Sequence, residues 1–225
     1  MKTALVTGGN KGIGYEVCRE LIAADYRVFL SARNRTKGEA AAKELGAEFL
    51  LMDISNEQSI EIASAELMTR TQKLDALVNN AGVFIERQDE GIAVSSAIIK
   101  QTFETNTVGA FLVTRAMLPL LEAAKGASVV NVSSGMGQLS DMRDGSLAYR
   151  FSKTALNAIT CSLASELSDK RITVNSVCPG WVKTDMGGQG ATRTVAQGAE
   201  TIVWLAKGEA NATAKFYRDK QVIAW

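Results

Sequence analysis

Histidine is absent from the 225 residues of this chain, and its absence excludes several kinds of enzyme. Ser-His-Asp and Cys-His hydrolases need an imidazole as their base, and most catalytic zinc sites use histidine ligands. Any acid or base in this protein must therefore be a Tyr, Lys, Asp, Glu or Cys side chain.

Cysteine and proline are scarce. The cysteines are Cys18, Cys161 and Cys178, which are dispersed and odd in number. Such spacing predicts neither a disulfide framework nor a metal cluster, so we interpret them as small core residues and expect no metal. Only two prolines interrupt the chain, and no linker, repeat or low-complexity segment divides it. These absences predict one domain spanning residues 1–225.

The chain also lacks a strong net charge and a long hydrophobic run. Its formal net charge is +1, with lysines and arginines scattered, which argues against a nucleic-acid partner. No apolar stretch reaches the length of a membrane span, and the first strand begins directly after Met1 and Lys2, which leaves no room for a signal peptide. We therefore expect a cytoplasmic protein with no membrane partner.

What the chain does have is a regular alternation of short apolar runs and longer helical patterns. The runs that we interpret as buried strands are 4–6, 28–30, 49–51, 76–78, 129–132 and 172–177. The helical patterns lie near 12–24, 36–45, 57–70, 96–125 and 147–168, with another beginning near Val195. This rhythm predicts an α/β fold with a doubly wound parallel sheet, helices on both faces and a ligand crevice at the carboxyl ends of the strands.

A glycine-rich turn follows the first strand. Gly8, Gly12 and Gly14 lack the side chains that would keep a phosphate away from the backbone, so the turn predicts a dinucleotide site. NAD would favour a carboxylate about twenty residues further on, but Arg33 stands there. Arg33, with Lys11 as a second cation, favours the 2′-phosphate of NADPH. The alternative interpretation is two solvated surface cations.

Tyr149 and Lys153 stand four residues apart on a predicted helix and therefore share one face. The ammonium group of Lys153 is expected to lower the pKa of the phenol, which would make Tyr149 a usable proton donor. Ser134 ends a strand and could donate a hydrogen bond to a substrate oxygen. An ordinary exposed Tyr–Lys pair and turn-forming serines at 133 and 134 are the alternatives.

The order of five motifs resembles the classical short-chain dehydrogenase/reductase family over nearly the whole chain. The motifs are 7–14, 79–82, 133–134, 149–153 and 178–180. The segment 178–186 and Trp225 are similar to the NADPH-dependent carbonyl reductases of that family. The resemblance implies a Rossmann-type sheet of about seven strands in the order 3-2-1-4-5-6-7.

The resemblance also implies roles for individual residues. Asp53 and Ile54 would contact the adenine, Lys153 the nicotinamide ribose, and Asn106 would interrupt a helix and hold a water that relays protons. The remaining cofactor contacts that it implies are Asn10 and Ile13 in the glycine turn, Asn80, Ala81 and Gly82 after the fourth strand, and Pro179, Gly180, Val182 and Thr184 after the sixth. The alternatives are helix capping by Asp53, a polar residue satisfied within the helix interior at Asn106, and simple turns at 79–82 and 179–180.

An apolar pocket is expected beside the nicotinamide. Its lining would include Ser134 and the side chains Met136, Leu139, Met142, Trp181 and Met186. The glycine-rich piece 187–190 predicts a substrate lid near 184–195. These side chains could equally be core residues.

The expected function is NADPH-dependent reduction of an aldehyde or ketone, with Tyr149 as the proton donor. An NADP-linked secondary-alcohol dehydrogenase and a non-catalytic NADPH sensor are the alternatives. We also expect a homodimer or homotetramer, because the helices at 96–125 and 147–168 would expose apolar residues such as Leu156, Ile159 and Leu163. Ordinary packing of these residues against the sheet is the alternative for part of this pattern.

Overall fold

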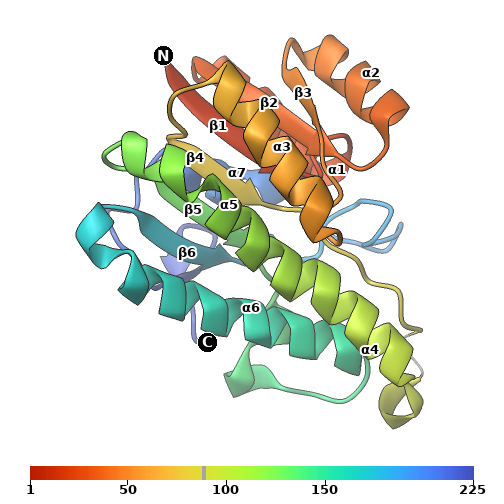
Figure 1. Ribbon diagram of the computed structural model, residues 1–225. Coiled ribbons are helices and arrows are strands. Elements are labelled where there is room, and N and C mark those ends of the chain that lie inside the picture. Colours follow the sequence, from red (N-terminus) through yellow and green to blue (C-terminus); the bar gives the residue numbers. More distant parts are fainter. Residues whose placement is uncertain (88–89) are drawn as a thin grey trace.

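A single twisted sheet lies at the centre of the computed structural model, which describes residues 1–87 and 90–225 (Figure 1). In the described part of the chain its strands are β1 (Lys2–Thr7), β2 (Tyr26–Ala32), β3 (Glu48–Leu51), β4 (Ala76–Asn79), β5 (Ser128–Val132), β6 (Thr173–Val177), β7 (Phe216–Arg218) and β8 (Gln221–Val222). Their order is β3-β2-β1-β4-β5-β6-β7-β8. The predicted order of seven parallel strands is confirmed, and β8 adds a short antiparallel edge.

Helices cover both faces of the sheet (Figure 1). They are α1 (Gly12–Ala23), α2 (Arg35–Leu45), α3 (Glu57–Arg70), α4 (Ser96–Phe103), α5 (Ala110–Ala123), α6 (Leu147–Glu166) and α7 (Val195–Ala206). One apolar core lies under α1, α2 and α7, and a second lies under α3, α5 and α6. Within the described residues, no helix has the combination of length and hydropathy that a bilayer crossing requires.

The strands form where the sequence has short runs of apolar residues. Leu5, Val6, Leu77 and Val78 are fully buried, as expected for a parallel sheet covered on both faces. Several helices start at residues that favour a helix N-terminus, since the side chain of Asn34 caps α2, and Thr194 with Gln197 forms a capping box at α7. Because β1 to β7 run parallel, their carboxyl ends, and hence the crevice, lie at one edge of the sheet.

The predicted long helix at 96–125 is interrupted. Between α4 and α5 the backbone forms a π-helical turn, Glu104–Gly109, which contains Asn106. A β-carbon on Gly109 would collide with the carbonyl oxygen of Ile54, so the backbone passes very close to the loop after β3 there. The interruption that the resemblance implied at Asn106 is thus confirmed, and it is of the kind often found at functional sites.

The apolar residues expected to face a partner subunit are placed differently. Leu156 is only 1% exposed and lies in the core, while Leu163 packs against the core cluster under α6 and Ile159 is half-buried. At Leu156 the alternative, ordinary packing against the sheet, is confirmed, because this part of the apolar stripe of α6 faces the core. The large apolar side chains that these helices expose are Phe103 and Phe151. Self-association stays a prediction.

Candidate active site

A cavity of about 630 Å³ opens at the carboxyl ends of the strands. It brings together most of the cofactor residues inferred from the sequence. These are Gly8, Asn10, Lys11, Gly12, Ile13, Gly14, Arg33, Asp53, Ile54, Asn80, Ala81, Gly82, Tyr149, Lys153, Pro179 and Thr184. The glycine turn and the Tyr149–Lys153 pair therefore line one cavity, although they lie more than 130 residues apart in the chain.

The glycine turn is built to bring backbone amides close to a ligand. Gly8 and Gly12 have φ values of 65° and 55°, which side chains other than glycine adopt at a cost. A β-carbon on Gly14 would collide with Asn80 Nδ2 and with the carbonyl oxygen of Gly8. Helix α1 has no side-chain cap at Lys11, so its first amide groups face the cavity without an intrahelical partner. This arrangement fits the pyrophosphate of a dinucleotide.

The two cations inferred for the 2′-phosphate, Arg33 and Lys11, differ in whether they pair with an acidic side chain. Arg33 is exposed at the rim of the cavity and makes no hydrogen bond or ion pair with any residue in the described part of the chain. Lys11 is paired with Asp185 through an Nζ–Oδ2 distance of 2.6 Å, and that contact lowers the pKa of the Asp185 carboxyl. Within the described residues the guanidinium of Arg33 is therefore available to an anionic ligand, whereas Lys11 would have to leave Asp185 or share its charge to bind one.

The loops after β3 and β4 are held by their own polar side chains. Asp53 Oδ1 accepts hydrogen bonds from the backbone N and the hydroxyl of Ser55, which fixes the carboxylate at the cavity. The side chain of Asn80 donates to the carbonyl oxygens of Thr7 and Gly8. Asn80 therefore joins the end of β4 to the glycine turn, which is a structural role, and the binding role of 79–82 stays a prediction.

Tyr149 and Lys153 lie on one face of α6, as predicted. Lys153 is buried, its Nζ donates a 2.8 Å hydrogen bond to the carbonyl oxygen of Val132, and it lies 5.6 Å from the centre of the Tyr149 ring. Burial lowers the pKa of Lys153 to about 8. The ammonium group is thus retained at neutral pH but titrates far below its usual range.

The prediction that the pKa of the Tyr149 phenol is lowered is wrong for this structure. Burial raises the pKa of Tyr149, the nearby Cys178 sulfur raises it further, and the hydrogen bond with Ser134 lowers it. Desolvation outweighs the favourable interactions because the phenol lies in the same water-poor corner as the ammonium group.

The two serines at the end of β5 have different roles. Ser133 lines the cavity and its hydroxyl donates to the carbonyl oxygen of Lys153 at 3.3 Å, so it ties β5 to α6. Ser134 Oγ accepts from the backbone N of Met136 at 3.1 Å and reaches Tyr149. Ser134 thus lies beside the phenol but outside the cavity lining, and its hydrogen bond to a substrate oxygen stays a prediction.

Asn106 lies behind the cavity and holds the segment after Gly82. Its Oδ1 accepts from the backbone N of Val83 at 2.7 Å, and its Nδ2 donates to the Val83 carbonyl oxygen and to Ser152 Oγ. A β-carbon on Gly82 would lie 3.1 Å from Asn106 Oδ1 and 3.6 Å from Lys153 Nζ. Asn106, Gly82 and Lys153 are therefore contiguous, and a side chain at position 82 would press closely against Asn106.

Cys178, which we expected only to fill space in the core, also accepts hydrogen bonds. Its sulfur is buried and accepts hydrogen bonds from the backbone N of Gly135 at 3.1 Å, the backbone N of Gly180 at 3.4 Å and Arg218 Nη2 at 3.0 Å. It thereby joins the turn after β5 to the turn after β6. Sequence reasoning missed this because the donors come from three separate parts of the chain.

The residues expected around the substrate are mostly at the surface. Leu139, Met142, Trp181 and Met186 are 68%, 39%, 56% and 48% exposed, and of these only Met186 lines the cavity. Met136 is half-buried outside the lining. Gly180 and Val182 are also outside it, and Val182 is instead buried against Gly198.

The expected lid is a hydrogen-bonded loop that leaves the sheet after β6. The backbone N of Arg193 donates to the Trp181 carbonyl oxygen, and the backbone N of Lys183 donates to that of Arg193. The indole N–H of Trp181 donates to the Gly187 carbonyl oxygen at 2.8 Å. Asp185, which sequence reasoning did not single out, lies in this loop and makes the ion pair with Lys11 across the cavity mouth.

Comparison with known proteins decides the family. The family model described as short chain dehydrogenase matches residues 2–195. The chain belongs to the short-chain dehydrogenase family. It is 34% identical to "Carbonyl reductase [NADPH] 3" of Rattus norvegicus, covering 100% of this chain and 98% of the relative, and 32% identical to "Carbonyl reductase [NADPH] 1" of Mus musculus, covering 99% and 98%.

Solved structures of this short-chain dehydrogenase fold superimpose closely on the whole chain. The carbonyl reductase Sniffer of D. melanogaster has a TM-score of 0.91 and 32% identity, with 100% of both chains covered. An NADPH-bound carbonyl reductase from chicken fatty liver has a TM-score of 0.90 and 26% identity, covering 100% of this chain and 94% of the other. The resemblance inferred from the five motifs is thereby confirmed.

Proposed function

We propose that this short-chain dehydrogenase is an NADPH-dependent carbonyl reductase that converts aldehydes or ketones to alcohols. One observation carries the proposal: a single cavity is lined both by the glycine turn and by Tyr149 and Lys153. The carbonyl reductases among the relatives, two of them named as NADPH enzymes, support the same activity.

The residues present fit NADPH. The glycine turn would hold the pyrophosphate, Asp53 the adenine, and the unpaired guanidinium of Arg33 the 2′-phosphate. Lys153 would hold the nicotinamide ribose from the opposite end of the cavity. When bound, this cofactor supplies the hydride that reduces the carbonyl carbon.

The protein's own part in the reaction is to orient the carbonyl group and to deliver a proton. Tyr149 donates its phenolic proton to the carbonyl oxygen, and the raised pKa keeps that proton in place until negative charge develops on the oxygen. Ser134 donates a hydrogen bond to the same oxygen and stabilises that charge. The buried ammonium group of Lys153 stabilises the tyrosinate that remains, and Asn106 supports the return of a proton from solvent.

The substrate inferred from the rim is a carbonyl compound with an apolar body. Trp181 and Met186 lie in the loop beside the cavity, and Leu139 and Met142 lie in the segment between Ser134 and α6, all with exposed apolar surface. Burying such surface against a substrate is favourable, and methionines adapt to different shapes. The loop near 184–195 would close over the bound substrate.

Consumption of NADPH by purified protein over a panel of quinones, diketones and aromatic aldehydes tests this function. Turnover that is faster with NADPH and ketone than with NADP and secondary alcohol supports the reductase over the alcohol dehydrogenase. Cofactor binding, measured by quenching of protein fluorescence, with no turnover of any compound would instead indicate an NADPH sensor.

A further inference from the structure

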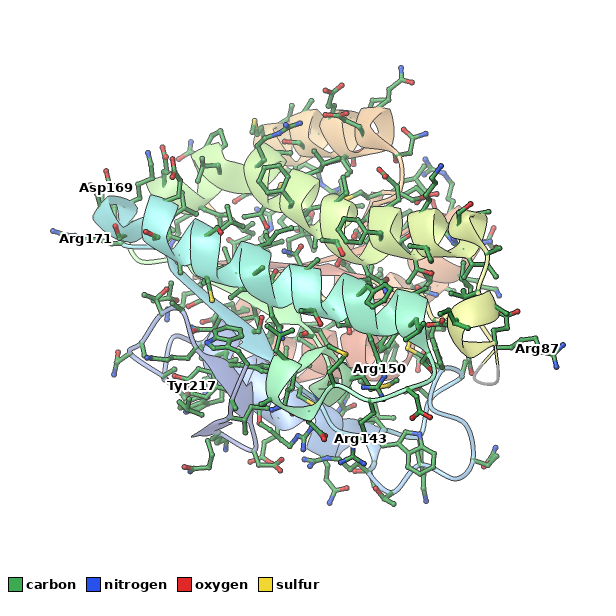
Figure 2. All side chains as sticks on the ribbon, turned by 90° about the horizontal axis from the view of Figure 1, so that it is seen from below. Arg87, Arg143, Arg150, Asp169, Arg171 and Tyr217 are labelled. Atoms are coloured by element: carbon green, nitrogen blue, oxygen red, sulfur yellow. The ribbon has the colours of Figure 1, made fainter. Side chains whose placement is uncertain are left out.

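Glu86 is a buried carboxylate that the proposed mechanism does not use. It is 6% exposed, lies in the loop between β4 and α4, and is absent from the cavity lining. The next side chain, Arg87, is exposed and projects from the edge of the molecule (Figure 2). Because burying a carboxylate without hydrogen bonds is costly, the buried side chain of Glu86 requires hydrogen-bond donors.

Those partners are the first amide groups of the helix that carries Tyr149. Glu86 Oε2 accepts from the backbone N of Ala148 at 3.0 Å, and Oε1 accepts from the backbone N of Tyr149 itself at 2.7 Å. Both are among the amide groups that a helix cannot satisfy internally. A carboxylate at this position also interacts favourably with the positive end of the helix dipole.

Helix α6 has no cap of its own to make these bonds. The residue before its first turn, Ser146, has φ 51° and ψ 44°, and its side chain accepts no hydrogen bond from the helix. The left-handed conformation turns Ser146 away from the usual capping geometry. Glu86, 62 residues earlier in the chain than Ala148, takes the place of the missing cap.

The segment that ends at Glu86 is attached to α6 at two further points. Val83 is held through both its backbone N and its carbonyl oxygen by Asn106, whose Nδ2 also donates to Ser152 Oγ on α6. Phe84 packs its ring against the ring of Tyr149, with 4.9 Å between centroids and an interplanar angle of 54°. Residues 83–86 thus contact Tyr149 through its ring and its backbone.

We propose that residues 83–86 form a positioning strap for Tyr149, in which Glu86 fixes the first turn of α6 and Phe84 restricts the phenol ring. The inference rests on the proposed reductase function, because it assigns the strap to the orientation of its proton donor. Glu86 itself touches neither the cavity nor the phenol oxygen and acts only through α6. Since misplacement of a reacting group by about 1 Å can cost roughly 100-fold in rate, fixing this turn matters for catalysis.

Two substitutions at Glu86 test the strap through steady-state kinetics. Glu86→Ala removes both acceptors, and we expect kcat to fall by roughly 10- to 100-fold while the dissociation constant of NADPH stays within about twofold. Glu86→Gln keeps one acceptor oxygen and should recover part of the lost kcat. A parallel loss of NADPH affinity, or an Ala variant with a wild-type kcat, overturns the proposal.

Asn56→Ala is the matched control, because the side chain of Asn56 caps α3 and that helix carries none of the proposed catalytic residues. Both cap variants are expected to lower Tm by a few degrees, roughly 2–4 °C for each lost cap in a domain of this size. Only the Glu86 variants should lower kcat. Equal losses of kcat in the two would show that Glu86 acts through stability alone.

Hydrogen exchange separates the strap from the proposed function. The amide protons of Ala148 and Tyr149 should exchange at least about tenfold faster in Glu86→Ala than in the wild type, with the amides of α3 unchanged. If the wild-type protein reduces no carbonyl compound, the proposed function fails while this readout still decides whether Glu86 holds the turn. Unchanged exchange at Ala148 and Tyr149 overturns the strap even in an active enzyme.

Phe84→Leu tests the ring contact separately, because leucine keeps apolar volume but loses the aromatic face. We expect a fall in kcat of about two- to fivefold with unchanged NADPH affinity, smaller than that of Glu86→Ala since the backbone contact remains. A kcat equal to that of the wild type removes Phe84 from the strap.

Discussion

The two ends of the cavity are built on different principles. At the glycine turn, the ligand-facing groups are backbone amides of neighbouring residues, and the charged side chains Arg33 and Lys11 are exposed. At the Tyr149 end, Lys153 and Asn106 are buried, and their hydrogen-bond partners come from β5, α6 and the loop after β4. Anion binding tolerates solvent and needs local chain geometry, whereas a tuned proton donor needs exclusion of water and side chains from several elements.

The largest expected effect separates the two ends directly. Tyr149→Phe removes the proton donor, so kcat should fall about 10³-fold, within the range for loss of general acid catalysis, while NADPH binding is kept. Tyr217→Phe, at a buried tyrosine on β7, is the control (Figure 2). Stopped-flow fluorescence gives the binding and NADPH absorbance gives the turnover. An active Tyr149→Phe variant would contradict the mechanism.

At the exposed end of the cavity, a substitution is expected to impair the use of NADPH rather than the proton transfer. Arg33→Asp replaces the unpaired guanidinium by a repelling carboxylate, so kcat/KM for NADPH should fall by roughly 30-fold or more and that for NADH should change little. Arg35→Ala, whose partner is Glu39, keeps the preference and serves as the control. Equal losses with both cofactors would remove Arg33 from the 2′-phosphate site.

The pKa of Lys153 predicts a pH dependence of stability in the alkaline range. Folding lowers this pKa from 10.5 to about 8, so between these values the unfolded chain holds more protons at Lys153 than the folded protein does. The free energy of unfolding is therefore highest, as far as Lys153 is concerned, above pH 10.5, where this side chain is neutral in both states. It decreases as the pH falls to about 8, because the folded protein then has to hold a buried ammonium group.

Urea unfolding of the wild type and Lys153→Met checks this dependence. The free energy of unfolding of the wild type, relative to the variant, should rise by about 2 kcal/mol between about pH 7.5 and pH 9.5. Lys43→Met, at an exposed position of α2, should give a difference from the wild type that does not change over this range. A constant difference for Lys153→Met would show that burial does not shift its pKa.

The smallest expected effect concerns the ion pair across the cavity mouth. The side chains of Lys11 and Asp185 are 66% and 80% exposed. Asp185→Asn frees Lys11 for the cofactor phosphate, so NADPH should bind about threefold tighter at low salt, and the gain should disappear at high salt. Titration calorimetry at two salt concentrations measures it, and Lys11→Gln combined with Asp185→Asn should show no gain. Weaker NADPH binding by Asp185→Asn would mean that the pair itself helps to hold the cofactor.

Sequence reasoning was most accurate where structure depends on neighbours in the chain. Local patterns correctly placed the glycine turn after β1, the Tyr149–Lys153 pair on one face of α6 and most of the strands, while the role of Arg33 stays a prediction. It failed where distant segments decide the environment. The direction of the pKa shift of Tyr149, the burial of Leu156, the bonding of Cys178 and the pairing of Lys11 all depend on contacts across the fold.

Sequence alone therefore determined the order of the strands' apolar runs, the dinucleotide turn and the identity of the Tyr–Lys pair, because backbone geometry and helical periodicity act over a few residues. Tertiary structure alone decided how that pair is solvated and held. Glu86 reaches Tyr149 across 63 residues, and Asn106 reaches Ser152 across 46. Desolvation and long-range hydrogen bonds exist only after the chain has folded, and no pattern in adjacent residues encodes them.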